Sequence, residues 1–204
     1  MVCDVAIDLS CASFLCPRLR DGDADGQPLL ECIAGCPDAA PQLKDGLAAE
    51  ARFSHPTQLL LLRDAHEEPY VLIADKYALR VLTGPCVGGR GEDRVATVGG
   101  QAAMDLAIQH QRMDSQTLEK EKEYSAHVDN MPTELLRCLG RLDFVRVQRV
   151  DHRVFVTSEV ISYASKLSMR PLRMFLLTPT DDPLQPQMTA IKQAKDGKPM
   201  IEYF

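Results

Sequence analysis

The chain has 204 residues, of which 45% are hydrophobic and 25% are charged, and this balance argues against gross disorder. Lys and Arg number 23 and Asp and Glu number 29, so the net charge of −6 opposes binding to a phosphate backbone unless the basic residues cluster. No stretch is apolar over the roughly 18 residues that a membrane-spanning helix needs, and residues 1–16 lack the basic start of a secretory signal. We therefore expect a cytoplasmic protein with no membrane partner.

The seven cysteines do not follow the spacing of a metal centre. Cys11 and Cys16 are separated by four residues, and residues 32 and 36 by three, whereas a tetrahedral zinc site is built from paired C-x2-C knuckles. We expect reduced thiols that pack as small hydrophobic groups. The sequence predicts neither a metal site nor a cofactor.

The first third of the chain predicts strands separated by loops. Apolar residues alternate over part of residues 2–9, which is typical of a short strand, and residues 20–27 are rich in Asp and Gly, which favours a loop. A short apolar run that ends in Gly follows at residues 29–35.

Four more short apolar runs follow at residues 57–62, 69–75, 78–83 and 94–99, each bounded by Gly, Pro, Asp or a charged turn. Their spacing leaves no room for the helices that connect parallel strands, so we expect an antiparallel meander. Residues 59–62 are four consecutive leucines, which predicts a strand covered on both faces.

The segments DGLAAEARFSHPTQLLLL, PYVLIADKYALRVL and VATVGG together resemble one repeat of the NHL β-propeller family, over residues 46–100. The resemblance assigns turn-holding and blade-contact roles, not catalytic ones, to the residues that match its pattern. These residues are Asp45, Gly46, Phe53, Pro56, Tyr70, Asp75 and Arg80. The Ala-Asp pair comes one residue later than in the family pattern, so we expect a slightly lengthened strand or a β-bulge near Leu72.

The resemblance implies a mainly β fold of antiparallel NHL-like blades with a helical insertion. A weaker second copy runs from residue 142 to 178, with its second strand at 154–159 and its third at 171–177. We expect a blade and N-terminal strands over 1–100, the insertion over 101–141, and a second blade with a tail over 142–204. Propellers close with about four to eight blades, so this chain would form an incomplete or partner-completed propeller with open apolar faces.

The insertion predicts two helices and one candidate interaction stripe. Residues 119–123 are charged and are interpreted as a solvated turn, and a second helix is expected at Pro132 with Asn130 as its cap. We expect the helices and the Pro-rich residues 178–186 to dock on a partner. The stripe, at steps of three and four residues, consists of Ala103, Leu106, Ala107, His110 and Met113.

A search for catalytic motifs finds no Walker loop, nucleophile elbow, H-E-x-x-H helix or Cys-His zinc pattern. The Gly-rich residues 84–91 are interpreted as a hairpin loop. His55, directly before Pro56, is the histidine best placed to reach a propeller axis, although a structural role is favoured. The arginines of residues 137–153 are interrupted by acidic residues and are interpreted as a solvated strand face.

The leading hypothesis is a non-catalytic interaction or scaffold subunit of a larger assembly, completed by other subunits or by self-association. One alternative is a metal-dependent lyase or hydrolase-like propeller fragment, which predicts stoichiometric metal near His55. Another alternative is an RNA-binding NHL module, which the negative net charge disfavours.

Overall fold

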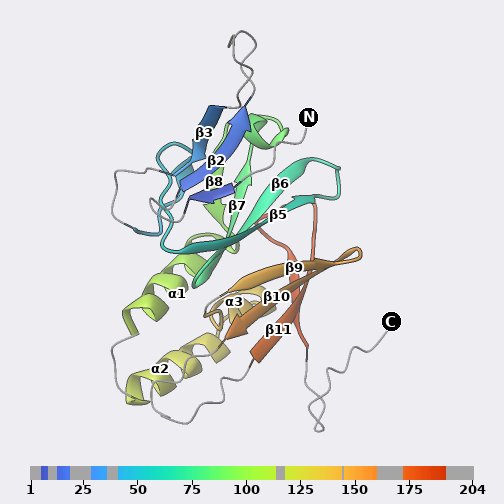
Figure 1. The fold of residues 1–204 in the computed structure, drawn as a ribbon. Coiled ribbons are helices and arrows are strands. Elements are labelled where there is room, and N and C mark those ends of the chain that lie inside the picture. The colour runs from blue at the N-terminus through green and yellow to red at the C-terminus, as the bar shows by residue number, and fades with distance from the viewer. Residues whose placement is uncertain are drawn as a thin grey trace, which may run out of the picture.

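The computed structural model describes residues 6–8, 13–18, 29–35, 41–113, 118–143, 145–159 and 172–191. In this part the chain is mainly antiparallel β structure with a few helices, as its short apolar runs predict (Figure 1). The strands are, in chain order, β1 Ala6–Asp8, β2 Ser13–Arg18, β3 Leu29–Ala34, β4 Gly46–Leu47, β5 Pro56–Arg63, β6 Pro69–Asp75, β7 Ala78–Thr83, β8 Arg94–Thr97, β9 Arg146–Val150, β10 Arg153–Glu159, β11 Leu172–Thr178 and β12 Gln187–Ala190.

The described strands form three sheets. The first sheet has the order β1-β2-β3, the middle sheet β4-β8-β7-β6-β5, and the last sheet β12-β11-β10-β9. Strands β5 to β8 form the predicted meander, and β4 adds a fifth strand beside β8. The last sheet is a second four-stranded meander that contains the two strands expected at residues 154–159 and 171–177.

The middle sheet is buried on both faces at β6 and β7, where only Pro69 and Thr83 are half-buried. We predicted such cover for residues 59–62, and this prediction is wrong at Leu61, which is 37% exposed. Among the described strands, β5 lies at the sheet edge and pairs with β6 alone. The register irregularity lies between Pro56 and Gln58 in β5, so the bulge expected near Leu72 is also misplaced.

The three sheets stack, with the middle sheet between the other two (Figure 1). One face of the middle sheet packs on the last sheet through a core that includes Leu72, Val81 and Phe175. Its other face packs on β3, where Ile73 belongs to the same core as Ile33. The edge strand β5 lies beside β1 of the first sheet and β9 of the last sheet.

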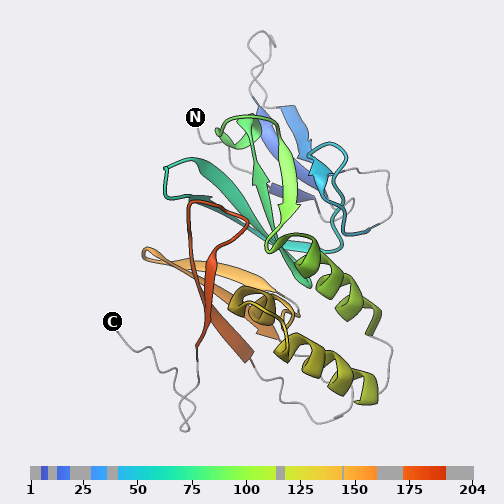
Figure 2. The ribbon, with the colours of Figure 1, turned by 180° about the vertical axis from the view of Figure 1, so that it is seen from behind.

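Three helices connect the middle and last sheets: α1 Gly100–Met113, α2 Leu118–Asp129 and α3 Glu134–Leu139. Figure 2 shows α1 and α2 along one side of the stacked sheets. Residues 119–123 lie inside α2, so the predicted charged turn is wrong. The cap of α3 is Thr133, which accepts a hydrogen bond from Leu136 N, and not Asn130. Within the described residues, no helix is long and apolar enough to cross a bilayer.

The Pro-rich residues 178–186 form the connection between β11 and β12 and do not extend away from the sheets. Leu184 packs against the core between the middle and last sheets, and its carbonyl accepts a 2.8 Å hydrogen bond from Gly99 N. Pro186 is buried. This segment therefore ties the last sheet to the end of β8.

Candidate functional site

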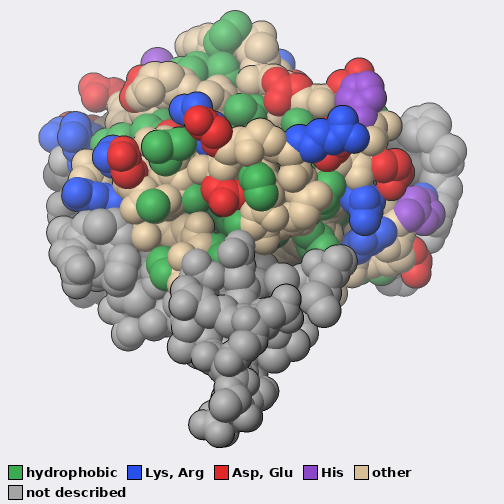
Figure 3. All heavy atoms as spheres, turned by 90° about the horizontal axis from the view of Figure 1, so that it is seen from above, with side chains coloured by type: hydrophobic (Ala, Val, Ile, Leu, Met, Phe, Trp, Pro, Cys, Tyr) green, Lys and Arg blue, Asp and Glu red, His purple; other side chains and the backbone are tan. Residues whose placement is uncertain are grey.

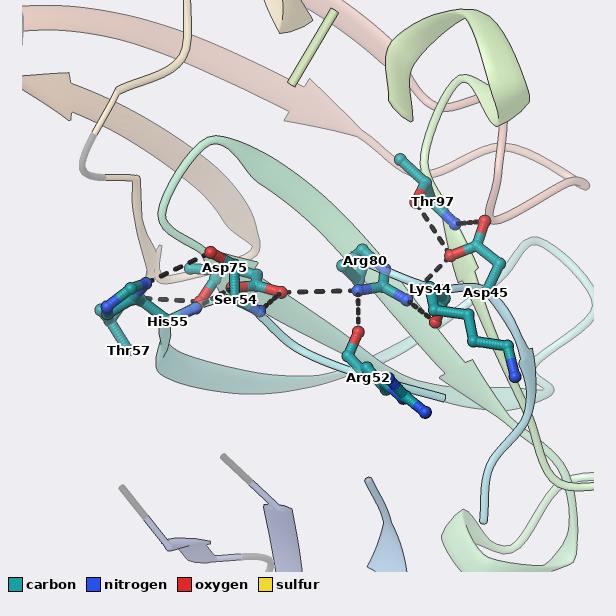
Figure 4. A network of polar contacts seen from close by, with 10 residues as sticks. Lys44, Asp45, Arg52, Ser54, His55, Thr57, Asp75, Arg80 and Thr97 are labelled. Atoms are coloured by element: carbon teal, nitrogen blue, oxygen red, sulfur yellow. Dashed lines mark hydrogen bonds and ion pairs between the residues drawn. The ribbon is translucent and has the colours of Figure 1, made fainter. Parts of the chain in front are cut away.

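A buried polar network on the middle sheet brings together residues that the repeat pattern singled out (Figure 4). Its centre is Arg80 on β7, whose side chain is fully buried. The guanidinium donates hydrogen bonds from Nη2 to Asp45 Oδ1 and to the Lys44 carbonyl, both at 2.8 Å, and from Nη1 to the Arg52 carbonyl at 3.0 Å. Its Nη1 also lies 3.4 Å from Asp75 Oδ2.

Asp45 extends the network to the far edge of the sheet. Its Oδ2 accepts a 2.8 Å hydrogen bond from Thr97 N, and its Oδ1 accepts a 2.9 Å bond from Thr97 Oγ1. Gly46, the next residue, starts β4 with a φ of 146°, a conformation that favours glycine. The Asp-Gly pair therefore fixes β4 against β8.

Asp75 closes the other end of the network. Its carboxylate accepts backbone hydrogen bonds from Ser54 N at 3.0 Å and from His55 N at 2.6 Å. Burial raises the pKa of Asp75, while Arg80 and these two N–H groups act in the opposite direction. A fully buried carboxylate is held by one guanidinium and two amides, so the network joins the end of β6 to the segment that enters β5.

The other residues of the repeat pattern lie before or within β5 and β6. The Phe53 ring is buried, with its centroid 5.0 Å from the Arg80 guanidinium carbon, a distance at which a cation–π contact forms. Pro56 starts β5, and Tyr70 is the second residue of β6. Arg80 and Asp75 at the centre bind groups of the same chain. The network therefore has the geometry of one that stabilises the fold.

The last sheet carries a related contact on its own third strand. Arg173 on β11 donates from Nη1 to the Arg141 carbonyl at 3.3 Å, as Arg80 on β7 donates to the Arg52 carbonyl. Arg52 lies four residues before β5 and Arg141 five residues before β9, so each acceptor precedes the first strand of its four-stranded meander. Burial, followed by the nearby Arg141, lowers the pKa of Arg173. The two meanders thus share their topology and one contact, a hydrogen bond from an arginine on the third strand to a backbone carbonyl that precedes the first strand.

The candidate interaction stripe on α1 faces the chain itself, which corrects our expectation that it binds a partner. Ala103, Leu106 and Ala107 are buried in three separate cores. The His110 ring lies between the rings of Tyr77 and Tyr124, at 5.1 Å from each centroid. The remaining member, Met113, is half-buried against α2.

Burial of three weak acids predicts a loss of stability at alkaline pH. Burial raises the pKa of Tyr70 from 10.0 to about 12 and that of Cys138 from 9.0 to about 12, and it raises the pKa of Tyr124 further. The unfolded chain therefore releases these protons at lower pH than the folded chain, and ionisation favours unfolding.

We expect these three groups to leave the free energy of unfolding unchanged below about pH 8.5 and to lower it progressively between about pH 9 and pH 12. Urea denaturation at stepped pH measures this profile. The variant Tyr124→Phe should reduce the loss above pH 10, although it also removes a 2.8 Å hydrogen bond to the Gly140 carbonyl. A stability that rises from pH 9 to pH 11 would contradict the burial of these groups.

The outer face of the last sheet carries apolar side chains that no described core covers. Phe155 and Leu176 are paired across β10 and β11, and Met174 is their neighbour on the same face. All three are half-buried, and none belongs to the described hydrophobic cores. Their sequence neighbours Val154, Val156 and Phe175 point to the other face and are buried. We call these three side chains the outer apolar face.

The remaining candidate groups are dispersed. His55 is exposed and lies 3.2 Å from Ser54 Oγ through its Nδ1. In the described ranges, no three His, Cys, Asp or Glu residues gather as metal ligands do. The Gly-rich residues 84–91 contain the short helix η1 Pro85–Val87 and lie in the loop between β7 and β8.

The charged surface is mixed where it is described. Arg137 pairs with Glu134 at 3.0 Å, and Arg141 pairs with Asp129. Figure 3 shows acidic and basic side chains interspersed with hydrophobic ones on the face seen from above. This alternation is unlike the continuous basic stripe that nucleic-acid binding uses.

Comparison with family models, with curated proteins and with solved structures finds no match. The described residues form a mainly β protein in which antiparallel sheets stack face to face, and none of their hydrophobic cores covers the outer face of the last sheet.

Proposed function

We propose that this protein is a non-catalytic interaction or scaffold subunit in which a partner sheet covers the outer apolar face. The proposal rests on one observation: the middle and last sheets differ in how many of their faces the described residues cover. The middle sheet is buried on both faces by its neighbours, whereas the last sheet is covered on one face only within the described residues. A face with Phe155, Met174 and Leu176 at its centre gains free energy when another apolar sheet covers it.

The likeness to NHL propeller blades supports the same function. Two sequential meanders stack, and their first strands, β5 and β9, lie side by side. Each third strand carries an arginine that donates a hydrogen bond to a backbone carbonyl before the first strand. In a propeller the first strands of the blades line the axis, and each blade is covered by the next one. In this proposal the chain supplies an arc of blades, and other subunits or a second copy supply the rest.

Replacing Leu176 by Lys tests the proposal, because it places a charge at the centre of the outer apolar face. We expect association with the partner or with a second copy to weaken by at least about tenfold. Sedimentation velocity over a concentration series, with the co-purified partner where one is present, measures the change. Thermal unfolding of the variant separates lost association from lost folding.

Leu47→Lys is the matched control. Leu47 is 42% exposed on β4, away from the last sheet, so the same substitution there should leave association unchanged. Equal association of wild type and the Leu176 variant would remove the outer apolar face from the proposal.

A further inference from the structure

A cavity of about 270 Å3 lies where the middle and last sheets meet, at the ends of β6 and β7. Three segments far apart in the sequence form its wall: the turn between β5 and β6, the Gly-rich loop, and the connection between β11 and β12, which contributes Pro183. Tyr70 and Thr83 line it from the middle sheet. It is separate from the Arg80 network and from the outer apolar face. We call it the Tyr70 cavity.

The first observation that points to a ligand is the position of Tyr70 in the cavity wall. This residue is 2% exposed and lines the cavity, and none of the hydrogen bonds among the described residues involves its hydroxyl. The hydroxyl is not among the described buried polar atoms that lack a partner, so it meets solvent, and a ligand group in the cavity can replace that water as its hydrogen-bond partner. Burial and the nearby Asp64 raise the pKa of Tyr70 to about 12, so the hydroxyl stays neutral at physiological pH.

The charges of the wall indicate the sign of that ligand. Asp64 Oδ1 accepts backbone hydrogen bonds from His66 N at 2.8 Å and Glu68 N at 2.9 Å, and Oδ2 makes no hydrogen bond with the described residues. Glu68 pairs with Arg90 at 3.1 Å, but the Arg90 side chain is 90% exposed and its charge is screened by water. Two carboxylates against one solvated guanidinium favour a cation.

We propose that the Tyr70 cavity binds the cationic end of a lysine or arginine side chain from the partner protein. The ammonium or guanidinium group donates hydrogen bonds to the Asp64 carboxylate and to the Tyr70 oxygen, and the aliphatic stem lies against Pro69 and Pro183. This inference names part of the partner's chemistry and so rests on the proposed function. In this inference the ligand contacts both the middle sheet and the connection between β11 and β12 of the last sheet.

Three capped tripeptides test the inference on the intact chain: acetyl-Gly-Lys-Gly-amide, acetyl-Gly-Arg-Gly-amide, and the norleucine analogue as the uncharged control. Titration at low ionic strength, followed by NMR of ring-labelled tyrosine, reports binding at Tyr70. We expect saturable binding of at least one cationic peptide, about tenfold or more tighter than that of the norleucine peptide.

Two variants test the contacts. Tyr70→Phe removes only the hydroxyl, and Asp64→Asn removes the charge but keeps an oxygen for the turn, so each should weaken binding about fivefold to tenfold without loss of folding. Glu92→Gln, an exposed carboxylate that does not line the cavity, should bind as the wild type does.

Equal binding of the charged and norleucine peptides would overturn the inference. Unchanged affinity in both variants, or absence of saturable binding, would overturn it as well. These results concern the isolated chain and a small probe, so they are independent of whether Leu176→Lys prevents association. Failure at the Tyr70 cavity is therefore distinguishable from failure of the proposed function.

Discussion

Replacing Arg80 by Met should destabilise the protein by about 3–5 kcal/mol, because it leaves the Asp75 carboxylate buried without its counterion. The variant also loses hydrogen bonds to Asp45 and to the carbonyls of Lys44 and Arg52, so β4 and the entry to β5 lose their common anchor. Urea denaturation followed by circular dichroism measures the change in the free energy of unfolding. A variant too unstable to purify would appear instead as insoluble expression.

The pair Arg80→Met and Asp75→Asn identifies the cause. If the uncompensated charge dominates, the double variant should recover part of the stability that the single arginine variant loses. Arg94→Met, at an exposed position on β8, should cost less than about 0.5 kcal/mol. A similar small cost for Arg80→Met would contradict the structural role of the network.

Replacing Gly99 by Ala should cost about 2–4 kcal/mol, since two penalties add at this position. Gly99 has a φ of 80°, which strains any residue with a side chain. A Cβ here would lie 2.7 Å from Leu139 Cδ1 and 2.9 Å from Ala103 Cβ. The clash falls where the middle sheet, α1 and α3 meet.

The neighbouring Gly100→Ala separates these penalties. Gly100 has a φ of 68°, but a Cβ there meets no atom within 4 Å, so only the backbone strain of about 1 kcal/mol should remain. Thermal and urea unfolding of both variants measure the difference. Equal costs at the two positions would show that the joint between the sheet and the helices is loosely packed.

The elements best predicted from sequence are those whose pattern is decided locally. Strands β6 and β7 match their expected bounds because continuous apolar runs end at Pro, Asp and Thr-Gly, and burial covers almost every position. Strand β12 was not predicted because only Met188 among its four residues is buried. Its place in the sheet depends on pairing with β11, which a local pattern does not contain.

Helix α2 was missed for a similar reason. Residues 119–123 are nearly all charged and show no apolar periodicity. The two buried side chains of α2, Tyr124 and Val128, pack against Leu106 on α1. The same contact shows that the apolar stripe on α1 packs within the chain, where its pattern alone indicates a partner surface. An amphipathic helix shows that an apolar face needs cover, but its own sequence does not show which element supplies that cover.

The residues of the Arg80 network were found through the family resemblance, because Asp45 and Arg80 are 35 positions apart and neither alone signals an ion pair. The Tyr70 cavity had no signal in the sequence, since its wall combines three distant segments. The outer apolar face was anticipated only as a general expectation of open faces. Its residues became identifiable once the register of β10 and β11 separated Phe155 from Val154 and Val156.

In the proposed function, a partner sheet covers the last sheet of this stack. Sedimentation equilibrium of the tagged protein purified under native conditions tests it most directly, in wild type, Leu176→Lys and Leu47→Lys. We predict a mass above the 22.6 kDa of one chain for wild type and for the Leu47 variant, and a mass close to 22.6 kDa for the Leu176 variant. A wild-type mass of one chain at tens of micromolar, with no bound partner, would contradict the account.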